Sequence, residues 1–166
     1  MANPLTLMLP IIPGTSVATL SGVLEQYVPQ LYAGLESVGT VHYARAIFLD
    51  TSKANLLPTG IFSNGPFVIA IITEYDGDFD TYIEDFVSAI GDVFNAVLPY
   101  VVGGAALVPV ANNVSAFQAF LAQNDASQQP PNNVALAESY TATVQQILAA
   151  LPGSAATSTA SPVPNA

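Results

Sequence analysis

The fold of this chain is decided by the stretch VHYARAIFLD at residues 41–50. Successive side chains of a β-strand point to opposite faces of a sheet, so Tyr43 and Ile47 face one way while Ala44 and Phe48 face the other. Both faces therefore carry apolar groups, and the β-branched run at residues 66–75 shares this property. A large apolar surface is rarely left in water. The sequence predicts a sheet that is covered on both faces.

Hydrophobic periodicity predicts the elements on either side of this stretch. We expect strands at residues 5–11, 41–50, 66–75 and 105–110, and helices at residues 17–38, 79–98, 114–123 and 134–151. Gly39 is placed to end the first helix, and Pro29, which lacks an N–H, should kink it or divide it into two pieces. Thr81 and Glu84 fit a capping box at the start of the second helix. Residues 1–152 then form one domain. Residues 153–166, rich in alanine, serine, threonine and proline, form a flexible tail.

The order of these elements is β-α-β-β-α-β followed by two helices, which is the ferredoxin-like split βαβ arrangement. We therefore predict an α+β fold with a four-stranded antiparallel sheet and helices on one face. The other face would stay bare in a single chain. Because its side chains are largely apolar, we expect a second copy to pack against it, sheet to sheet, in a homodimer.

Composition excludes several classes of protein and of site. The 166 residues include 12 acids but only Arg45 and Lys53 as bases, which gives a net charge of −10. Nucleic acids and anionic lipid surfaces are recognised by many cations, so neither is an expected partner. The absence of cysteine excludes disulfides and thiolate chemistry, and a single histidine excludes a multi-histidine metal site within one chain. We expect neither a metal nor a cofactor.

No stretch is predicted to span a membrane. The longest apolar run, at residues 93–110, is broken by Asn95, Pro99 and two glycines, and its pieces fall short of the roughly 20 residues that a bilayer needs. The N-terminal residues carry no positive charge ahead of the first apolar run, unlike a secretory signal. We expect a cytoplasmic protein.

Two segments and the order of elements resemble those of a known group. The segments are His42-Tyr43-Ala44-Arg45 and Thr73-Glu74-Tyr75-Asp76-Gly77-Asp78. Over residues 4–110 the pattern is similar to that of the dimeric α/β-barrel superfamily, which includes cofactor-independent monooxygenases, polyketide cyclases, EthD-like proteins and stress-responsive barrel proteins. The resemblance implies the fold and a homodimer. Because the superfamily hosts many chemistries, it implies no particular reaction.

His42 is the candidate catalytic residue, because histidine titrates near neutral pH without any perturbation. A hairpin in which Asp50 faces Pro66 would place His42 opposite Glu74, with about 5 Å between their β-carbons. Glu74 could then orient the imidazole as a general base. The alternative is a histidine that only holds the end of its strand through a hydrogen bond.

Arg45 and Tyr43 are the candidate ligand-binding residues. Arg45 lies in the middle of a strand among apolar neighbours, and a buried guanidinium needs an anionic partner, either a carboxylate or a ligand. Tyr43 shares its face and could donate a hydrogen bond to a ligand carbonyl. The alternative for Tyr43 is a core position with its hydroxyl satisfied internally.

The acidic turn that follows the third strand contains only part of a metal-binding motif. Asp76, Asp78 and Asp80 match the first, third and fifth ligands of a calcium loop, but Thr81 and Val87 replace the glycine and the bidentate glutamate that such a loop needs. The favoured interpretation is a solvated turn whose acids stabilise the N-terminus of the next helix. No metal site is predicted.

The sequence favours a homodimeric barrel protein that binds a small, largely apolar molecule in a pocket between sheet and helices. For an enzyme, cofactor-free proton transfer fits best, with His42 as the base, Glu74 orienting it, and Tyr43 or Arg45 polarising an oxygen. The alternative is a non-enzymatic structural or self-assembling protein, which the low density of charge favours. The sequence does not decide between an enzyme and a protein without catalysis.

Overall fold

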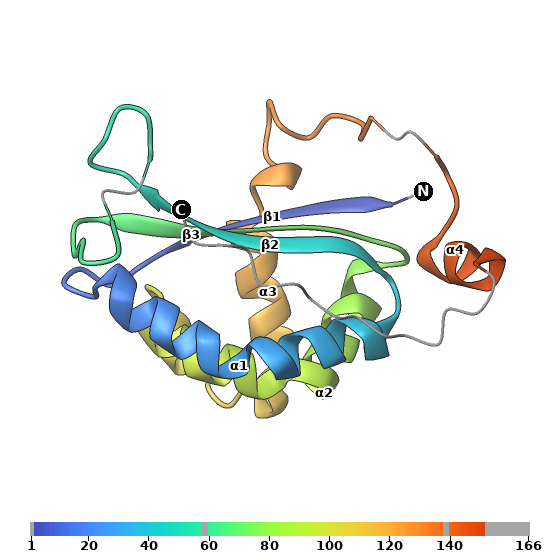
Figure 1. Ribbon diagram of the computed structural model, residues 1–166, viewed down its shortest axis with the longest axis horizontal. Coiled ribbons are helices and arrows are strands. Elements are labelled where there is room, and N and C mark those ends of the chain that lie inside the picture. The colour runs from blue at the N-terminus through green and yellow to red at the C-terminus, as the bar shows by residue number, and fades with distance from the viewer. Residues whose placement is uncertain (1, 58–59, 138–139, 152–166) are drawn as a thin grey trace.

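The structure is a computed structural model that describes residues 2–57, 60–137 and 140–151. It shows an α+β fold in which three antiparallel strands of the described residues form one open sheet, with three long helices beneath it (Figure 1). The strands are β1 (Asn3–Pro10), β2 (Val41–Asp50) and β3 (Phe67–Tyr75). The helices are α1 (Val17–Val38), α2 (Phe79–Val97), α3 (Val114–Asn124) and the short α4 (Val144–Ala150). In this part of the chain, no helix combines the length and the apolarity needed to span a membrane.

Local signals place the ends of α1 where the sequence predicts them. The Ser16 side chain accepts a hydrogen bond from the Thr19 N–H at 3.0 Å, which caps the N-terminus. Gly39 ends the helix with a φ of 63°, in the left-handed region that favours glycine. The helix continues through Pro29. Both predicted bounds are therefore confirmed.

The sheet has the strand order β1-β3-β2, and both pairs are antiparallel. Tyr43 lies opposite Glu74 and Asp50 opposite Phe67, so the register differs by one residue from the predicted pairing of Asp50 with Pro66. A β-bulge between Val41 and Tyr43 makes up the difference at the start of β2. This bulge decides where the candidate site residues point.

One face of the sheet packs on helices α1, α2 and α3 and forms the core. We call it the helix face; β1 contributes Leu5, Leu7 and Leu9 to it, all nearly inaccessible to water. Helices α1 and α2 pack closely at Gly34, where an added β-carbon would clash with the Ile90 side chain. Apolar side chains buried from water on this face supply most of the stability of the fold.

The predicted fourth strand at residues 105–110 is wrong. The segment forms the 3-10 turns Gly104–Leu107 and Val110–Asn112, whose backbone groups bond locally. In the ferredoxin-like arrangement a fourth strand pairs with the outer edge of β1. That edge is already occupied, because Val102 N–H donates to the Pro10 carbonyl and Thr6 N–H donates to Asp125. The sheet therefore stays three-stranded in the described residues.

Two further predictions need correction. The helix predicted at residues 134–151 is shorter, because α4 begins only after Thr143, where Thr143 and Gln146 form a reciprocal capping box. Helix α2 is capped by Asp78, which accepts from the Thr81 N–H at 3.0 Å, and not by the predicted pair of Thr81 and Glu84. The predicted flexible tail at residues 153–166 lies outside the described residues.

Candidate functional site

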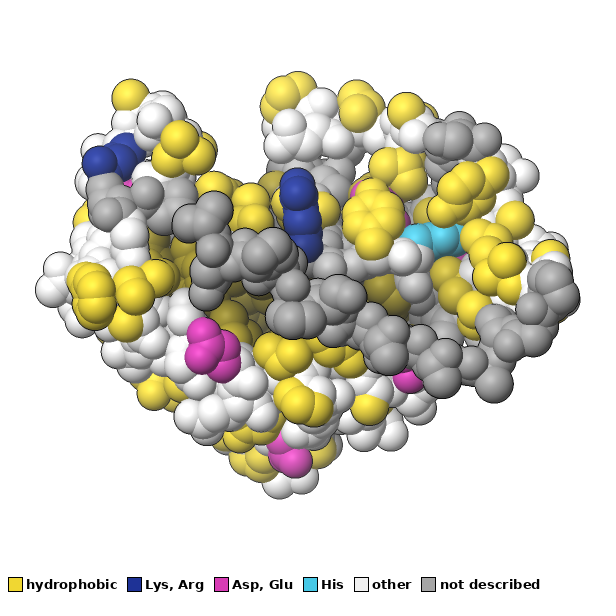
Figure 2. All heavy atoms as spheres, in the orientation of Figure 1, with side chains coloured by type: hydrophobic (Ala, Val, Ile, Leu, Met, Phe, Trp, Pro, Cys, Tyr) yellow, Lys and Arg dark blue, Asp and Glu magenta, His cyan; other side chains and the backbone are white. Residues whose placement is uncertain are grey.

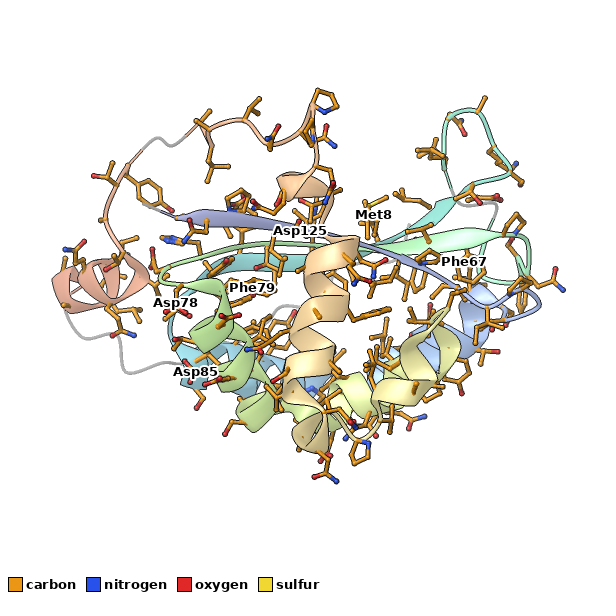
Figure 3. All side chains as sticks on the ribbon, turned by 180° about the vertical axis from the view of Figure 1, so that it is seen from behind. Met8, Phe67, Asp78, Phe79, Asp85 and Asp125 are labelled. Atoms are coloured by element: carbon orange, nitrogen blue, oxygen red, sulfur yellow. The ribbon has the colours of Figure 1, made fainter. Side chains whose placement is uncertain are left out.

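The face of the sheet opposite the helices is only partly covered, and we call it the open face. In Figure 3 the labelled Met8 lies on this side of the sheet and Phe67 on the helix side. Two segments rise above the open face at its two ends: the loop wall, residues 51–57, and the C-terminal wall, residues 126–137 and 140–143 (Figure 1). The surface is hollowed between them (Figure 2). In the described part of the single chain this face is thus largely bare, as the sequence predicts, since Tyr43 is 56% exposed; the predicted cover by a second copy stays a prediction.

A hollow of about 190 Å³ lies between the open face and the C-terminal wall, and we call it the His42 hollow. Its polar residues are His42, Tyr43, Glu74 and Tyr140, and its remaining lining is apolar: Ala2, Leu136, Ala137 and Ala142. The sequence predicts the meeting of His42, Tyr43 and Glu74, and the structure brings these three residues together. The predicted pocket between sheet and helices is not where they meet, because this hollow lies on the other side of the sheet.

The β-bulge explains how consecutive residues reach the same hollow. In a regular strand, His42 and Tyr43 would point to opposite faces. The extra residue between Val41 and Tyr43 disturbs this alternation, as bulges do when they redirect a side chain. Both residues therefore line the His42 hollow.

The carboxylate that holds His42 is Asp76, and not the predicted Glu74. His42 Nε2 lies 3.1 Å from Asp76 Oδ1, and the two side chains are only 7% and 13% exposed. The second oxygen, Asp76 Oδ2, accepts from the Val144 N–H at 2.7 Å, at the start of α4. The Tyr140 ring lies 6.0 Å from the imidazole, between ring centres. Asp76 thus joins the histidine, the acidic turn and the C-terminal helix.

Glu74 is buried, with 7% of its surface exposed, and lies directly opposite Tyr43. Partial burial of the hydroxyl, together with the charge of Glu74 and a hydrogen bond to it, raises the pKa of Tyr43 above its ordinary value. Tyr43 therefore stays protonated at neutral pH and donates to the carboxylate. Polar groups held in this way can orient a bound molecule.

A second hollow of about 470 Å³ adjoins the first under the C-terminal wall. The two share Glu74, Leu136 and Ala137, while the second continues over Pro4 and Thr6 of β1. Together they reach the range of about 300–1,000 Å³ that is typical of small-molecule sites. The acidic group thus lies where two hollows with apolar walls meet.

The other predicted residues lie elsewhere. Arg45 is exposed on the open face, lines neither hollow, and forms no salt bridge with any described residue. Asp78 caps α2, and that hydrogen bond lowers its pKa. No group of three or more histidine, cysteine or acidic side chains in the described ranges could hold a metal ion.

Two residues of the site escaped prediction from sequence. Tyr140 and Asp76 come from a segment predicted as helix and from a turn whose acids were interpreted as solvated. A signal for Asp76 was available in the sequence. Asp76 directly follows β3, which pairs with β2, the strand that carries His42, so its carboxylate could be expected near the imidazole. Tyr140 carries no comparable signal, since its contact with His42 spans almost one hundred residues.

No protein-family model matches this chain, and neither the curated proteins nor the solved structures contain a match. The resemblance to the dimeric α/β-barrel superfamily therefore stays a prediction.

Proposed function

We propose that the chain binds a small, largely apolar molecule with one polar group in the His42 hollow and the hollow that adjoins it. The observation that carries the proposal is the convergence of His42, Tyr43 and Glu74, together with Tyr140, on a cavity whose other lining residues are apolar. Apolar walls with a few fixed polar groups are the usual composition of a small-molecule site. Glu74 would accept a hydrogen bond from a hydroxyl of the ligand, and Leu136 would contact its apolar part.

Titration with p-cresol and with toluene tests this proposal, because the two molecules differ by one hydroxyl. In amide-resolved NMR, p-cresol should shift the signals of Tyr43, Glu74 and Leu136, and toluene should bind at least fivefold more weakly. Glu74→Gln should weaken p-cresol binding at least fivefold. Asp85→Asn, which removes one acid from an exposed position on α2, is the matched control and should leave binding unchanged. Shifts scattered over the helices would contradict the proposal.

Proton transfer is the second candidate function, and the contact between His42 and Asp76 favours it. If Asp76 accepts from Nε2–H, the other ring nitrogen, Nδ1, is the proton acceptor of the neutral imidazole. A histidine oriented by a carboxylate can then take a proton from a bound ligand. In this proposal Asp76 has the orienting role that the sequence analysis gives to Glu74.

The predicted dimeric barrel would place the sheet of a second copy against the open face. Ligand binding does not depend on that arrangement, because both hollows are built from one chain. The two walls rise at opposite ends of the open face, so a second sheet would have to fit between them (Figure 1). Self-association is better supported at a different surface, the edge of the sheet.

A further inference from the structure

The two edges of the sheet differ in the hydrogen bonds that they form with the other described residues. The outer edge of β1 is covered along its length: Thr6 N–H donates to Asp125 at 2.9 Å, Ser127 donates to the Pro4 carbonyl, and Val102 N–H donates to the Pro10 carbonyl. No such contact is made along the middle of β2 by any described residue. Among the described residues, β2 is therefore the open edge of the sheet.

The alternation of an antiparallel ladder shows which backbone groups of β2 have no partner among the described residues. Thr6 N–H points away from β3, so its partner Ile72 must direct its own N–H and C=O toward β2. Ile72 lies opposite Arg45, so Arg45 is bonded to β3. The N–H and C=O groups of the alternate, even-numbered residues of β2 then point away from β3. Asp50 fits this pattern, because its N–H donates to the Leu56 carbonyl of the loop wall and not to β3. The outward residues before it are Ala44, Ala46 and Phe48.

The side chains around this edge suit contact with another strand. Ala44, Arg45 and Ala46 are exposed and small or flexible. The chain carries a net charge of −10, yet residues 37–49 contain no acid and a single base. Two copies of a strongly acidic chain repel each other, and the low charge of β2 allows them to approach there with little repulsion. An exposed strand edge of low charge is a template for pairing.

We propose that two copies of this chain pair through β2, antiparallel and related by a two-fold axis at Ala46, to form a continuous six-stranded sheet. Ala46 then lies opposite Ala46, and Ala44 opposite Phe48. All three N–H and all three C=O groups of the open edge find partners, which gives six hydrogen bonds between the copies. The proposal goes beyond ligand binding and does not depend on it.

The other symmetric registers are less favourable. An axis at Arg45 places two guanidinium groups directly opposite each other, where like charges repel. An axis at Ala44 places Phe48 beyond the start of the partner strand, because β2 begins at Val41. The axis at Ala46 sets Arg45 opposite Ile47, so that the arginine stem lies on an apolar neighbour.

Single cysteines test the register, because the chain has none of its own. In the Ala46→Cys dimer, the Cα atoms of the two cysteines would lie about 5.5 Å apart. This distance is within the Cα–Cα range that a disulfide spans. Mild oxidation should give a disulfide-linked dimer. The matched control, Ala44→Cys, offsets its cysteines by about 13 Å along the strand direction in this register and should give at least tenfold less dimer. Equal crosslinking of the two variants, or preferential crosslinking at residue 44, overturns the register.

The dimer itself is tested by sedimentation velocity over a range of concentrations of the full chain. Ala46→Pro removes an outward N–H without touching the ladder to β3, and should raise the dissociation constant at least tenfold while the circular dichroism of the fold is retained. Hydrogen exchange at Ala44, Ala46 and Phe48 should slow as the concentration rises. A concentration-independent monomer overturns the proposal. Protection of these amides in a monomer, lost on truncation after Leu151, would assign the edge to residues 152–166 instead.

Discussion

The two faces of the sheet are built from similar residues but are buried very differently. On β1, the neighbours Leu7 and Met8 point to opposite sides; Leu7 is 3% exposed under the helices, whereas Met8 is half-buried on the open face. The tyrosines repeat the contrast, since Tyr82 on α2 is buried against the helix face and Tyr43 is largely exposed on the open face. Apolar character in a strand therefore does not show which face the chain itself will cover.

This difference separates stability from function along a single sheet. The helix face is a continuous apolar core, and its few polar contacts are internal, such as the hydrogen bond of 2.9 Å between Thr73 and Tyr82. The open face carries the redirected His42, the buried Glu74 and both hollows of the candidate site. Changes on the two faces should accordingly affect different measurements.

The largest expected effect compares Leu7→Ala with Met8→Ala. Leu7→Ala removes buried methyl groups and leaves a cavity under the helices, so the free energy of unfolding should fall by about 2–5 kcal/mol. Met8→Ala shortens a half-buried side chain on the open face and should cost less than about 1 kcal/mol. Urea denaturation of both variants measures the difference. Equal losses would mean that the open face is as tightly packed as the core.

Alkaline pH should give the next largest effect, through tyrosines at the helix face. Burial, and then the charge of Asp125, raises the pKa of Tyr75 from 10.0 to about 12, and burial also raises the pKa of Tyr82. The folded state thus favours the neutral phenol. The contribution of the neutral Tyr75 phenol to stability is complete below pH 10 and is lost as the pH rises toward 12. Because Tyr75 borders a water-accessible hollow, we discount the effect to about 1–2 kcal/mol.

Denaturation midpoints between pH 9 and 12 measure this loss of stability. A comparison of two tyrosine variants shows which residue causes it. Tyr75→Phe should flatten the alkaline loss of stability, because the titrating group is gone. Tyr43→Phe is the matched control from the open face, where 56% of the residue is exposed, so that solvent screens the charge of the phenolate and its titration should affect the fold less. A flattening by Tyr43→Phe as large as that by Tyr75→Phe would show that the two faces do not differ in this respect.

Sequence predicted those parts of the fold that depend on local signals. Helix α1 and strand β2 have the predicted bounds, because a capping serine, a terminal glycine and alternating apolar residues act within a few positions. The strand predicted at residues 105–110 failed because pairing depends on an available edge. The outer edge of β1 is not available, because Thr6 and Pro10 are hydrogen-bonded there to Asp125 and Val102, which lie far along the chain.

The sequence predicted only part of the candidate site, because Arg45 lines neither hollow and neither Asp76 nor Tyr140 was expected there. His42, Tyr43 and Glu74 share one hollow, yet the pairing that led to this expectation was off by one residue, and a bulge restored the contact. Sequence patterns specify strand register weakly where the connecting loop is long. The carboxylate bonded to His42 proved to be Asp76, two residues from the predicted one.

The smallest expected effect on global stability is found by comparing Asp76 with Asp78. These residues lie two positions apart but contact elements on opposite faces of the sheet. Asp78 caps α2 on the helix face, so Asp78→Ala should measurably lower the midpoint of urea denaturation. Asp76 holds the start of α4 beside the open face. Because α4 has seven residues and none of them is buried, Asp76→Ala should cost less than about 0.5 kcal/mol globally.

Asp76→Ala should instead act locally, because a helix as short as α4 is not stable without tertiary contacts. After the loss of the Asp76 carboxylate, the hydrogen bond of 2.7 Å from the Gln145 side chain to the Gly39 carbonyl is one remaining attachment. Hydrogen exchange at Val144 and along α4 should accelerate at least tenfold, while the amides of β3 keep their protection. If Asp76→Ala lowers the urea midpoint as much as Asp78→Ala does, α4 unfolds together with the core. The wall beside His42 would then be part of the same cooperative unit as the helix face, and the separation of stability from function along the sheet would not hold.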